Sequence, residues 1–346
     1  MPRLRFGLSY DFRNPPESGL AMPQLYAETL EQMVWAESLG FDQLWFTEHH
    51  FVEDGYLPSW VPVAGAVAAR TERIRISQDI CILPFHNPIN LDEDLAVLDN
   101  LSNGRVELGV GMGYAPHEFR GFGFPVSRRL SLMEEGLAVL RRCFHGERFS
   151  FQGKRYAFSD VHIKPDYVQA GGPPLWVAAM ARNGALRAAR FDGHLLPQGP
   201  RAEVLEPWRD ALSAAGRDPA SYRVGIIRGV LVTDDPERDW PRIREAERTR
   251  MRVYKRFFAE SGQPGPQDTS RGAWIPQTWI VGDVETCVEQ LSAFITEHGL
   301  TDFVSWAVPP GLRPHEMNAS LERLGREVIP RVRARLDRPA EPGDAA

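Results

Sequence analysis

Short apolar segments alternate with amphipathic ones along almost the whole 346-residue chain, and this alternation restricts the fold more than any other feature of the sequence. The apolar segments have the length and the β-branched and aromatic content of buried strands. Eight segments are predicted as strands: Leu4–Ser9, Gln43–Phe46, Ile74–Ile82, Arg105–Val110, Pro174–Ala179, Gly193–Leu196, Arg223–Val232 and Asp302–Ala307.

Amphipathic helices are predicted between these strands, because apolar residues recur there at three- and four-residue steps. Glycines follow several of the helix ends, as helix termination favours. The predicted helices are Pro23–Leu39, Pro62–Ala69, Pro88–Leu101, Arg128–Phe144, Asn183–Arg190, Glu203–Ala215 and Cys287–Glu297. Eight strands alternating with helices predict an α/β protein, a (β/α)8 TIM barrel with insertions, formed by one domain over residues 1–336.

Three segments depart from the alternation. Phe149–Phe158 alternates apolar and polar residues around Gly153, which predicts a small hairpin. Ser261–Thr278 is long and rich in Gly, Pro and Trp, so we expect a functional or mobile loop. The tail over residues 337–346 is expected to be disordered.

Composition excludes several classes of protein. The formal charge of −6 provides no basic surface for nucleic acid or for an anionic membrane. The sequence has no uninterrupted apolar run of about 18 residues, so no membrane span is predicted. Cys81, Cys143 and Cys287 are odd in number and widely spaced, which indicates a reduced, cytoplasmic protein without a disulfide framework.

The densest group of ionisable residues is Glu48-His49-His50, directly after the Gln43–Phe46 strand. Chemistry in a parallel barrel takes place at the carboxyl ends of the strands, and a neighbouring carboxylate tunes a histidine near neutral pH. These three residues are therefore the predicted catalytic group. Neighbouring side chains on an extended segment point to opposite sides, so we expect one histidine to face the barrel mouth and the other to brace it.

Two other interpretations of this group are possible from the sequence. The two histidines can be loop residues that only hydrogen-bond the backbone. A metal is not predicted, since adjacent side chains rarely converge on one ion and the sequence shows no third ligand.

Two strand ends are poor in large side chains and suggest room for a cofactor. Gly109, Gly111 and Gly113 stand at alternate positions, so a flat cofactor or a phosphate is expected to lie against the face that they leave bare. An ordinary tight turn is equally compatible with this stretch. At the next strand end, residues 179–183 lead into a helix whose first N–H groups can bind phosphate.

Arg228 and a group of aromatic residues are further candidates for ligand contact. Arg228 interrupts an apolar strand, so it either contacts a ligand or pairs with an acid inside the structure. Tyr114 and Trp306 are predicted, with Arg228, to contact the substrate. The aromatic residues expected at the mouth favour an apolar pocket; they are Trp45, Phe51, Tyr56, Trp60, Tyr114, Phe119, Phe122, Trp274, Trp279 and Trp306.

Several of these stretches together resemble the bacterial luciferase-like flavin-dependent oxidoreductases. The matching pieces are GFDQLWFTEHHF at 40–51, ICILP at 80–84, LSNGRVELGVG at 101–111, GFG at 121–123 and EVIP at 327–330. The resemblance extends over about residues 3 to 335, nearly the whole chain.

The resemblance implies a (β/α)8 barrel that binds reduced FMN at its mouth. It also implies a monooxygenase that uses O2, through a C4a-hydroperoxyflavin, to oxidise an apolar organic substrate. By the same resemblance, His49 corresponds to the family's catalytic histidine, and His50 and Glu48 organise it. Asp79 and Ile80 fall where the family has a cis peptide below the flavin ring.

The resemblance also assigns residues to the cofactor. Gly111 and Met112 match positions near the flavin ring and phosphate, and Gly113 continues this cofactor-binding set. The family's phosphate loop matches four residues of this chain: Ala179, Met180, Ala181 and Asn183.

The chain departs from light-emitting luciferases at Gly111, where they have a reactive cysteine, and at Met112, where they have a phosphate-contacting arginine. We therefore expect exchangeable FMN, supplied in reduced form by a separate flavin reductase, because no NAD(P)H-binding βαβ unit is visible. The alternatives are F420-dependent hydride transfer on the same fold and a non-catalytic flavin-binding homologue. The resemblance also suggests a homodimer formed through the Pro62–Ala69 and Pro88–Leu101 helices.

Overall fold

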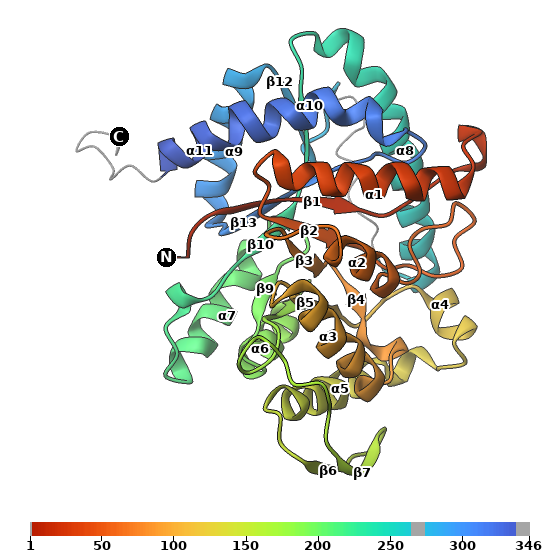
Figure 1. Ribbon diagram of the computed structural model, residues 1–346, viewed down its shortest axis with the longest axis vertical. Helices are drawn as coiled ribbons and strands as arrows, with labels where there is room; N and C mark the ends of the chain where they lie inside the picture. Colours follow the sequence, from red (N-terminus) through yellow and green to blue (C-terminus); the bar gives the residue numbers. More distant parts are fainter. Residues whose placement is uncertain (1, 264–273, 337–346) are drawn as a thin grey trace.

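The computed structural model describes residues 2–263 and 274–336. Short strands alternate with helices along this part of the chain, as the sequence predicted (Figure 1). The strands are β1 (Arg5–Tyr10), β2 (Gln43–Phe46), β3 (Arg75–Gln78), β4 (Cys81–Ile82), β5 (Leu108–Gly111), β6 (Phe149–Gln152), β7 (Ala157–Val161), β8 (Leu175–Ala178), β9 (His194–Leu196), β10 (Gly225–Ile227), β11 (Gly229–Val232), β12 (Trp279–Gly282) and β13 (Asp302–Trp306).

The α-helices cover the strands from outside and several of them begin at side-chain caps. Asn87 accepts from the N–H of Ile89 at the start of α3, and Asp283 accepts from the N–H of Thr286 at the start of α9. The helices are α1 (Met22–Ser38), α2 (Val61–Ala68), α3 (Pro88–Ser102), α4 (Pro116–Gly121), α5 (Arg129–Phe144), α6 (Arg182–Arg190), α7 (Ala202–Ala214), α8 (Pro236–Ser261), α9 (Val284–His298), α10 (Asn318–Arg323) and α11 (Ile329–Leu336).

Parallel strands close into a ring. One sheet has the order β10-β13-β1-β2-β3, and a second has the order β4-β5-β8-β9. Two isolated parallel bridges join the sheets, Ile76 to Val106 and Leu195 to Val224. Within the described residues, the ring therefore has eight strand positions, with β3 and β4 sharing one and β10 and β11 another. The predicted (β/α)8 barrel is confirmed.

Two of the predicted strands are interrupted. Ile74–Ile82 divides into β3 and β4 at a cis Asp79–Ile80 peptide bond, the position that the family resemblance indicated. Arg223–Val232 divides into β10 and β11 at Arg228. At each interruption the chain changes its partner strand: β3 pairs with β2 and β4 with β5, and β10 pairs with β13 and β11 with β12.

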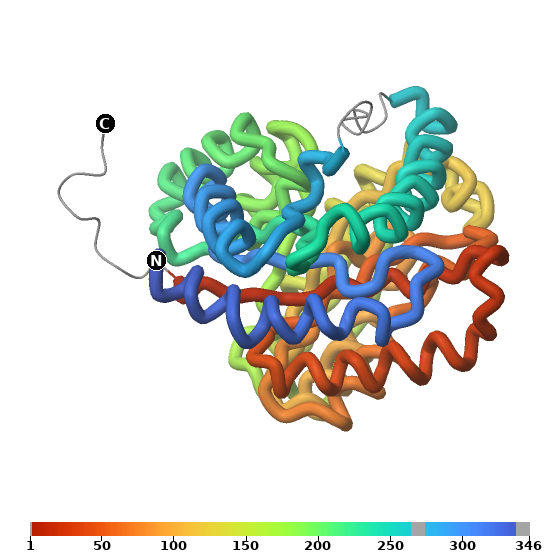
Figure 2. The backbone as a smooth tube through the Cα atoms, turned by 90° about the horizontal axis from the view of Figure 1, so that it is seen from above, coloured from red at the N-terminus to blue at the C-terminus, as the bar shows by residue number. Residues whose placement is uncertain are grey.

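Outside the ring, the predicted hairpin is present as the antiparallel pair β6 and β7, which extends away from the barrel at the lower edge of Figure 1. The helix α11 returns to the N-terminal segment (Figures 1 and 2), where Arg333 stacks on Phe6 and pairs with Asp42. In the part of the chain described here, no helix is both long and apolar enough to cross a bilayer.

Two predictions concern residues beyond this part of the chain. The predicted Ser261–Thr278 loop lies partly outside the described residues, since positions 264–273 are not among them. The predicted disordered tail at 337–346 lies wholly outside them.

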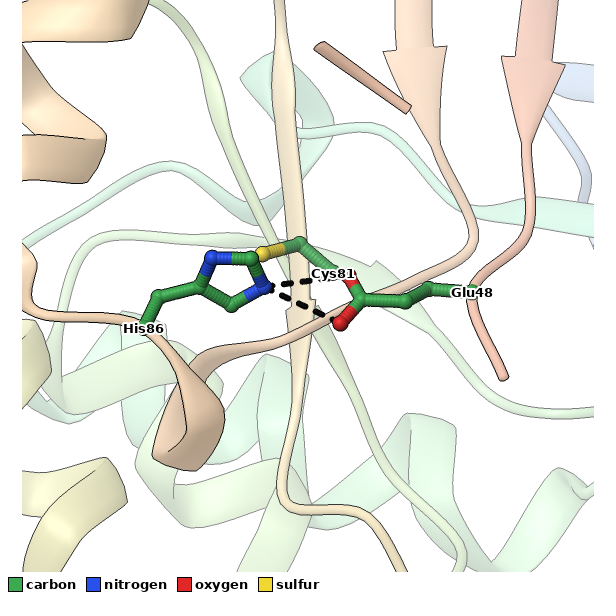
Figure 3. Close-up of side chains that lie close together, drawn as sticks. All are labelled: Glu48, Cys81 and His86. Carbon is green, nitrogen blue, oxygen red and sulfur yellow. Dashed lines mark hydrogen bonds and ion pairs between the residues drawn. The ribbon is translucent and has the colours of Figure 1, made fainter. Parts of the chain in front are cut away.

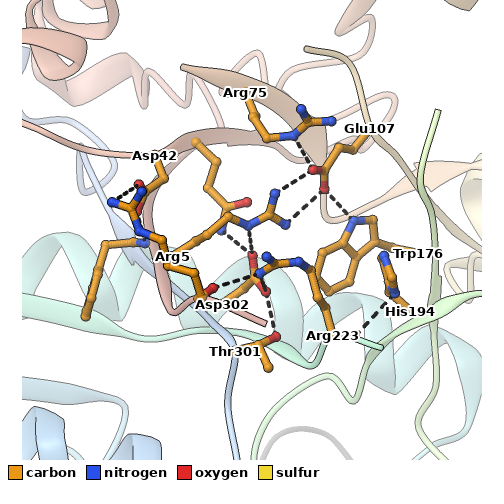
Figure 4. Close-up of polar contacts among 12 residues, drawn as sticks. Arg5, Asp42, Arg75, Glu107, Trp176, His194, Arg223, Thr301 and Asp302 are labelled. Atoms are coloured by element: carbon orange, nitrogen blue, oxygen red, sulfur yellow. Dashed lines mark hydrogen bonds and ion pairs between the residues drawn. The ribbon is translucent and has the colours of Figure 1, made fainter. Parts of the chain in front are cut away.

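The amino-terminal end of the barrel is held together by buried ion pairs (Figure 4). The Arg5 guanidinium on β1 pairs at 2.6 Å with Glu107, which precedes β5, and at 2.6 Å with Asp302 on β13. Trp176 on β8 donates to the other oxygen of Glu107 at 2.7 Å. Burial would raise the pKa of Glu107, but Arg5 and Arg75 hold it well below its usual range. One charged cluster thus connects four strand positions around the ring.

Removing one member of this cluster should be costly, because the remaining charges stay buried without their partner. We expect Glu107→Gln to lower the free energy of unfolding by about 3–5 kcal/mol. The matched control is Glu31→Gln, since Glu31 is 72% exposed and pairs with Arg70 on the surface. The control should cost less than about 1 kcal/mol. Urea unfolding of both variants tests this, and equal effects would contradict the assigned role of Glu107.

Candidate active site

The chain leaves the barrel after β2 through residues 47–50, and the two histidines there point to different surroundings. The ring of His49 lies among aromatic side chains, whereas the ring of His50 packs against Phe51, Phe85 and Phe122. The two rings therefore have different neighbours, as expected for adjacent residues of an extended segment. Both side chains are buried.

A carboxylate from another element orients His49. Glu118 on α4 is buried, and its Oε1 lies 2.9 Å from Nδ1 of His49. The same oxygen accepts from the backbone N–H of His50 at 2.8 Å, which fixes the carboxylate against the loop. A carboxylate at Nδ1 leaves Nε2 as the ring nitrogen available for proton transfer. His49 and Glu118 therefore form an imidazole–carboxylate dyad.

Four aromatic rings surround the imidazole of this dyad. Tyr56 and Phe257 lie 4.8 and 4.9 Å from the His49 ring centroid, and Tyr114 and Tyr254 lie 5.8 and 6.0 Å from it. Two of these residues come from α8, which lies beside α4 (Figure 2). We call Tyr56, Tyr114, Tyr254 and Phe257 the aromatic box. Together these rings bury the imidazole of His49.

Polar groups at the rim of the box are engaged with one another. The hydroxyls of Tyr56 and Tyr254 are 2.9 Å apart, and burial raises the pKa of both phenols. The Arg250 guanidinium pairs with Asp11 and Glu247 and lies 3.7 Å from the Trp306 ring centroid. These contacts link α8, which carries Tyr254 and Phe257, to the segments that follow β1 and β2.

Glu48 has a different position from the one expected. From the sequence, Glu48 and His50 were expected to organise His49, but Glu48 instead bonds His50 at 2.8 Å and His86 at 3.0 Å. Burial would raise the pKa of Glu48, but the two histidines lower it to about 2. The organising carboxylate at His49 is Glu118, which is 69 residues further along the chain and which the sequence analysis missed. The sequence signal that could have identified Glu118 is that it lies between Tyr114 and Phe122, in a segment expected at the barrel mouth.

The predicted bare face of the β5 strand end is also wrong, because neighbouring atoms already fill the space beside its glycines. A Cβ on Gly109 would lie 1.9 Å from the carbonyl oxygen of Gln78, and one on Gly111 would lie 1.9 Å from Cδ1 of Ile80. Gly113 has a φ of +66°, and a Cβ there would lie 2.8 Å from Ile82. These glycines allow the β3–β4 segment to approach β5 closely, so Ile80, not a bare backbone, is the surface beside Gly111.

The remaining predicted residues lie in three places. Asp79 accepts from the Gln198 amide at 2.5 Å, and burial raises its pKa to about 6. Met180, Ala181 and Asn183 are exposed at the start of α6, and Arg201 lies near the carbonyl of Met180 at 3.5 Å. Ala179 is buried and Met112 is partly buried.

Tyr114 belongs to the aromatic box and Trp306 lies against Arg250 on α8, but Arg228 lies elsewhere. The Arg228 guanidinium stacks 4.1 Å above the Phe294 ring on α9, in the outer helix layer. Burial lowers the pKa of Arg228, and Glu297 acts in the opposite direction. Of the two interpretations left open by the sequence, this geometry favours a structural role, and the substrate contact predicted for Arg228 is not supported.

A separate cavity of about 160 Å³ opens between α5 and the β7–β8 connection, lined among others by Phe144, Ile163 and Tyr167. It contains none of the predicted site residues. Its volume is below the range of about 300–1,000 Å³ usual for cofactor pockets.

Comparison with known proteins agrees with the fold. A family model described as luciferase-like monooxygenase matches residues 4–302. The 4-hydroxyprotoasukamycin monooxygenase of Streptomyces nodosus subsp. asukaensis is 26% identical over 364 residues, covering 97% of this chain and 94% of its own length. The F420-dependent glucose-6-phosphate dehydrogenase of Beutenbergia cavernae is 30% identical, covering 89% and 94%.

One solved structure shows the same fold. The oxygenating constituent of 3,6-diketocamphane monooxygenase from Pseudomonas putida, a type II Baeyer–Villiger monooxygenase in complex with FMN, superposes with a TM-score of 0.80. It is 20% identical and covers 95% of this chain and 98% of its own.

The interpretation of the glycines as sites of close approach predicts a difference between two substitutions. Gly109→Ala should destabilise the protein by at least about 1–3 kcal/mol, because the new methyl group meets a backbone oxygen that cannot rotate away. Gly65→Ala on α2 is the control, since its nearest neighbour would be the Leu98 side chain at 3.7 Å. Alanine favours a helix, so this control should be neutral or slightly stabilising. Thermal unfolding distinguishes them, and a harmless Gly109→Ala would refute the close approach.

Proposed function

The chain belongs to the luciferase-like monooxygenase family, and on this premise we propose that it is an FMN-dependent monooxygenase. Reduced FMN would arrive from a separate flavin reductase. The protein would then use O2 to oxidise an apolar organic substrate. The single observation that supports this most is the His49–Glu118 dyad inside the aromatic box, at the carboxyl end of a barrel strand.

The residues around the dyad fit a flavin. Ile80 presents an apolar side chain beside Gly111, against which a flat ring can pack. The first N–H groups of α6 have no helical partners and can bind a phosphate. Arg182 is the first residue of this helix, and the guanidinium of Arg201 lies 3.5 Å from the carbonyl oxygen of Met180 beside it. Bound reduced FMN would supply the two electrons that convert O2 into one oxygen atom for the substrate and one water molecule.

The chain's own residues have separable tasks in this proposal. His49 holds or transfers a proton at Nε2, and Glu118 keeps the imidazole in the required orientation. The aromatic box binds the apolar part of the substrate and limits access of water. Tyr114 and Trp306 remain the proposed substrate contacts. A cytoplasmic location and a homodimer remain predictions; Val97 and Leu101 on α3 are exposed apolar residues consistent with such an interface.

A second candidate is F420-dependent hydride transfer, which the 30% identical glucose-6-phosphate dehydrogenase favours. The two candidates differ in the fate of O2. The protein is supplied with reduced FMN, a flavin reductase, ¹⁸O2 and a panel of apolar ketones and aldehydes. The proposal predicts that the product of at least one of these substrates contains one ¹⁸O atom. A parallel reaction contains oxidised F420 in place of FMN. Substrate oxidation there with stoichiometric reduction of F420, and without ¹⁸O in the product, would establish the second candidate instead. Flavin binding without either reaction would indicate a non-catalytic homologue.

Substitutions at the dyad give the second test. His49→Ala should lower the rate of labelled product formation by about 10²–10⁴-fold. Glu118→Gln should lower it by at least about tenfold and change the pH profile, because it acts through His49.

The control is Glu260→Gln, since Glu260 pairs with Nδ1 of His117 at 2.9 Å and not with His49. Circular dichroism should show all three variants folded. Unchanged product formation in folded His49→Ala would remove the proposed role of the dyad.

A further inference from the structure

A second cluster of ionisable side chains lies outside the dyad, on the other side of the residue 47–50 loop. Figure 3 shows Glu48, Cys81 and His86, which come from the end of β2, from β4 and from the turn after β4. One ligand atom from each, the carboxylate oxygen, Sγ and an imidazole nitrogen, lies within 4.8 Å of the other two. The side chain of Glu48 is fully buried and that of His86 is 26% exposed.

The carboxylate in this cluster is held in a fixed orientation. Its two oxygens lie 3.0 and 3.2 Å from Nε2 of His86. His50 bonds Oε1 at 2.8 Å from another direction, and the N–H of Ile82 donates to Oε2 at 3.2 Å. Such outer contacts orient the ligands in protein metal sites and strengthen binding.

We propose that Glu48, Cys81 and His86 form a binding site for one divalent cation of the zinc class. A thiolate, an imidazole nitrogen and a carboxylate oxygen are the donors that Zn²⁺ and Co²⁺ accept together. Three protein ligands leave a fourth tetrahedral position, which water fills. On binding, the Cys81 thiol and Nε2 of His86, which donates to Glu48 in the metal-free protein, each release a proton to solvent, and the freed sulfur and nitrogen lone pairs bond the metal.

Charge balance favours this occupant. A dication with one thiolate and one carboxylate gives a neutral unit, which is the least costly charge state for a buried site. His50 then stays outside the coordination sphere as the residue that orients Glu48. Phe85 and Phe122, whose rings lie 5.6 and 4.7 Å from that of His50, keep the surroundings apolar. The exposed edge of His86 gives the ion a route from solvent.

The metal site could not be predicted from the sequence, because its three ligands do not follow a recognisable metal-binding spacing. The sequence motif contains only Glu48, His49 and His50, whose side chains diverge, and no further ligand stands beside them in the chain. Folding brings Cys81 and His86 to Glu48 from 33 and 38 residues away in the chain. The inference does not depend on the proposed oxygenation, since it concerns residues on the far side of the loop.

Titration of the full-length, metal-stripped protein with Co²⁺ tests the proposal. We expect one equivalent to bind with a Kd below about 1 μM and to produce a thiolate-to-cobalt charge-transfer band in the near ultraviolet. One equivalent of Zn²⁺ should abolish the band by displacement and raise the melting temperature. Neither readout requires flavin or substrate.

Matched variants locate the bound ion. Cys81→Ser should abolish the charge-transfer band, and His86→Gln should weaken Co²⁺ binding at least about tenfold. Cys143→Ser and His117→Gln are the controls, since these residues are a buried thiol and a histidine outside the cluster. Absence of stoichiometric binding, or a band that persists in folded Cys81→Ser, would overturn the proposal and leave the cluster as a hydrogen-bonded structural unit.

Discussion

The position of every functional group depends on closure of the barrel, and closure is anchored by the guanidinium of Arg5. This one cation lies at the amino-terminal end of the ring and joins β1 to the segment before β5 and to β13. A buried cation of this kind is stable only with its carboxylates in place, so the pairing specifies which strands meet. The opposite end of the same strands is thereby free to carry loops with chemical groups.

At the carboxyl end of the barrel, two adjacent histidines lie in different surroundings. His49 is oriented by Glu118 and enclosed by aromatic rings, whereas His50 belongs to the Glu48 cluster. The backbone between them separates an environment suited to proton transfer from one rich in metal-ligand atoms. Family membership, the dyad and the aromatic box support the proposed oxygenase, and the relative named as an F420-dependent glucose-6-phosphate dehydrogenase supports the second candidate.

Local patterns in the sequence predicted the elements well, because strands and helices of a (β/α)8 barrel are short and each has its own periodicity. The strand before the histidines, Gln43–Phe46, has the predicted boundaries, and the 149–158 hairpin was also recognised. The cis peptide at Asp79–Ile80 was anticipated only through the family resemblance. These features depend on residues that are close together in the chain.

The errors concern contacts between distant residues. Glu118 reaches His49 across 69 positions, and no spacing rule identifies such a partner. The glycines of β5 were interpreted as an open face because the sequence does not show that Gln78 and Ile80 fill it. Arg228 was expected to contact the substrate. Its stacking on Phe294 depends on how α9 packs, which the sequence does not show. Tertiary packing decides each of these, and periodicity carries no information about it.

A crystal structure of the protein with bound FMN tests the central claim most directly. The account predicts that the flavin ring packs on Ile80, with its reactive face toward Nε2 of His49 and with the His49–Glu118 hydrogen bond intact. A flavin bound elsewhere, or an imidazole turned away from Glu118 and from the ring, would contradict it.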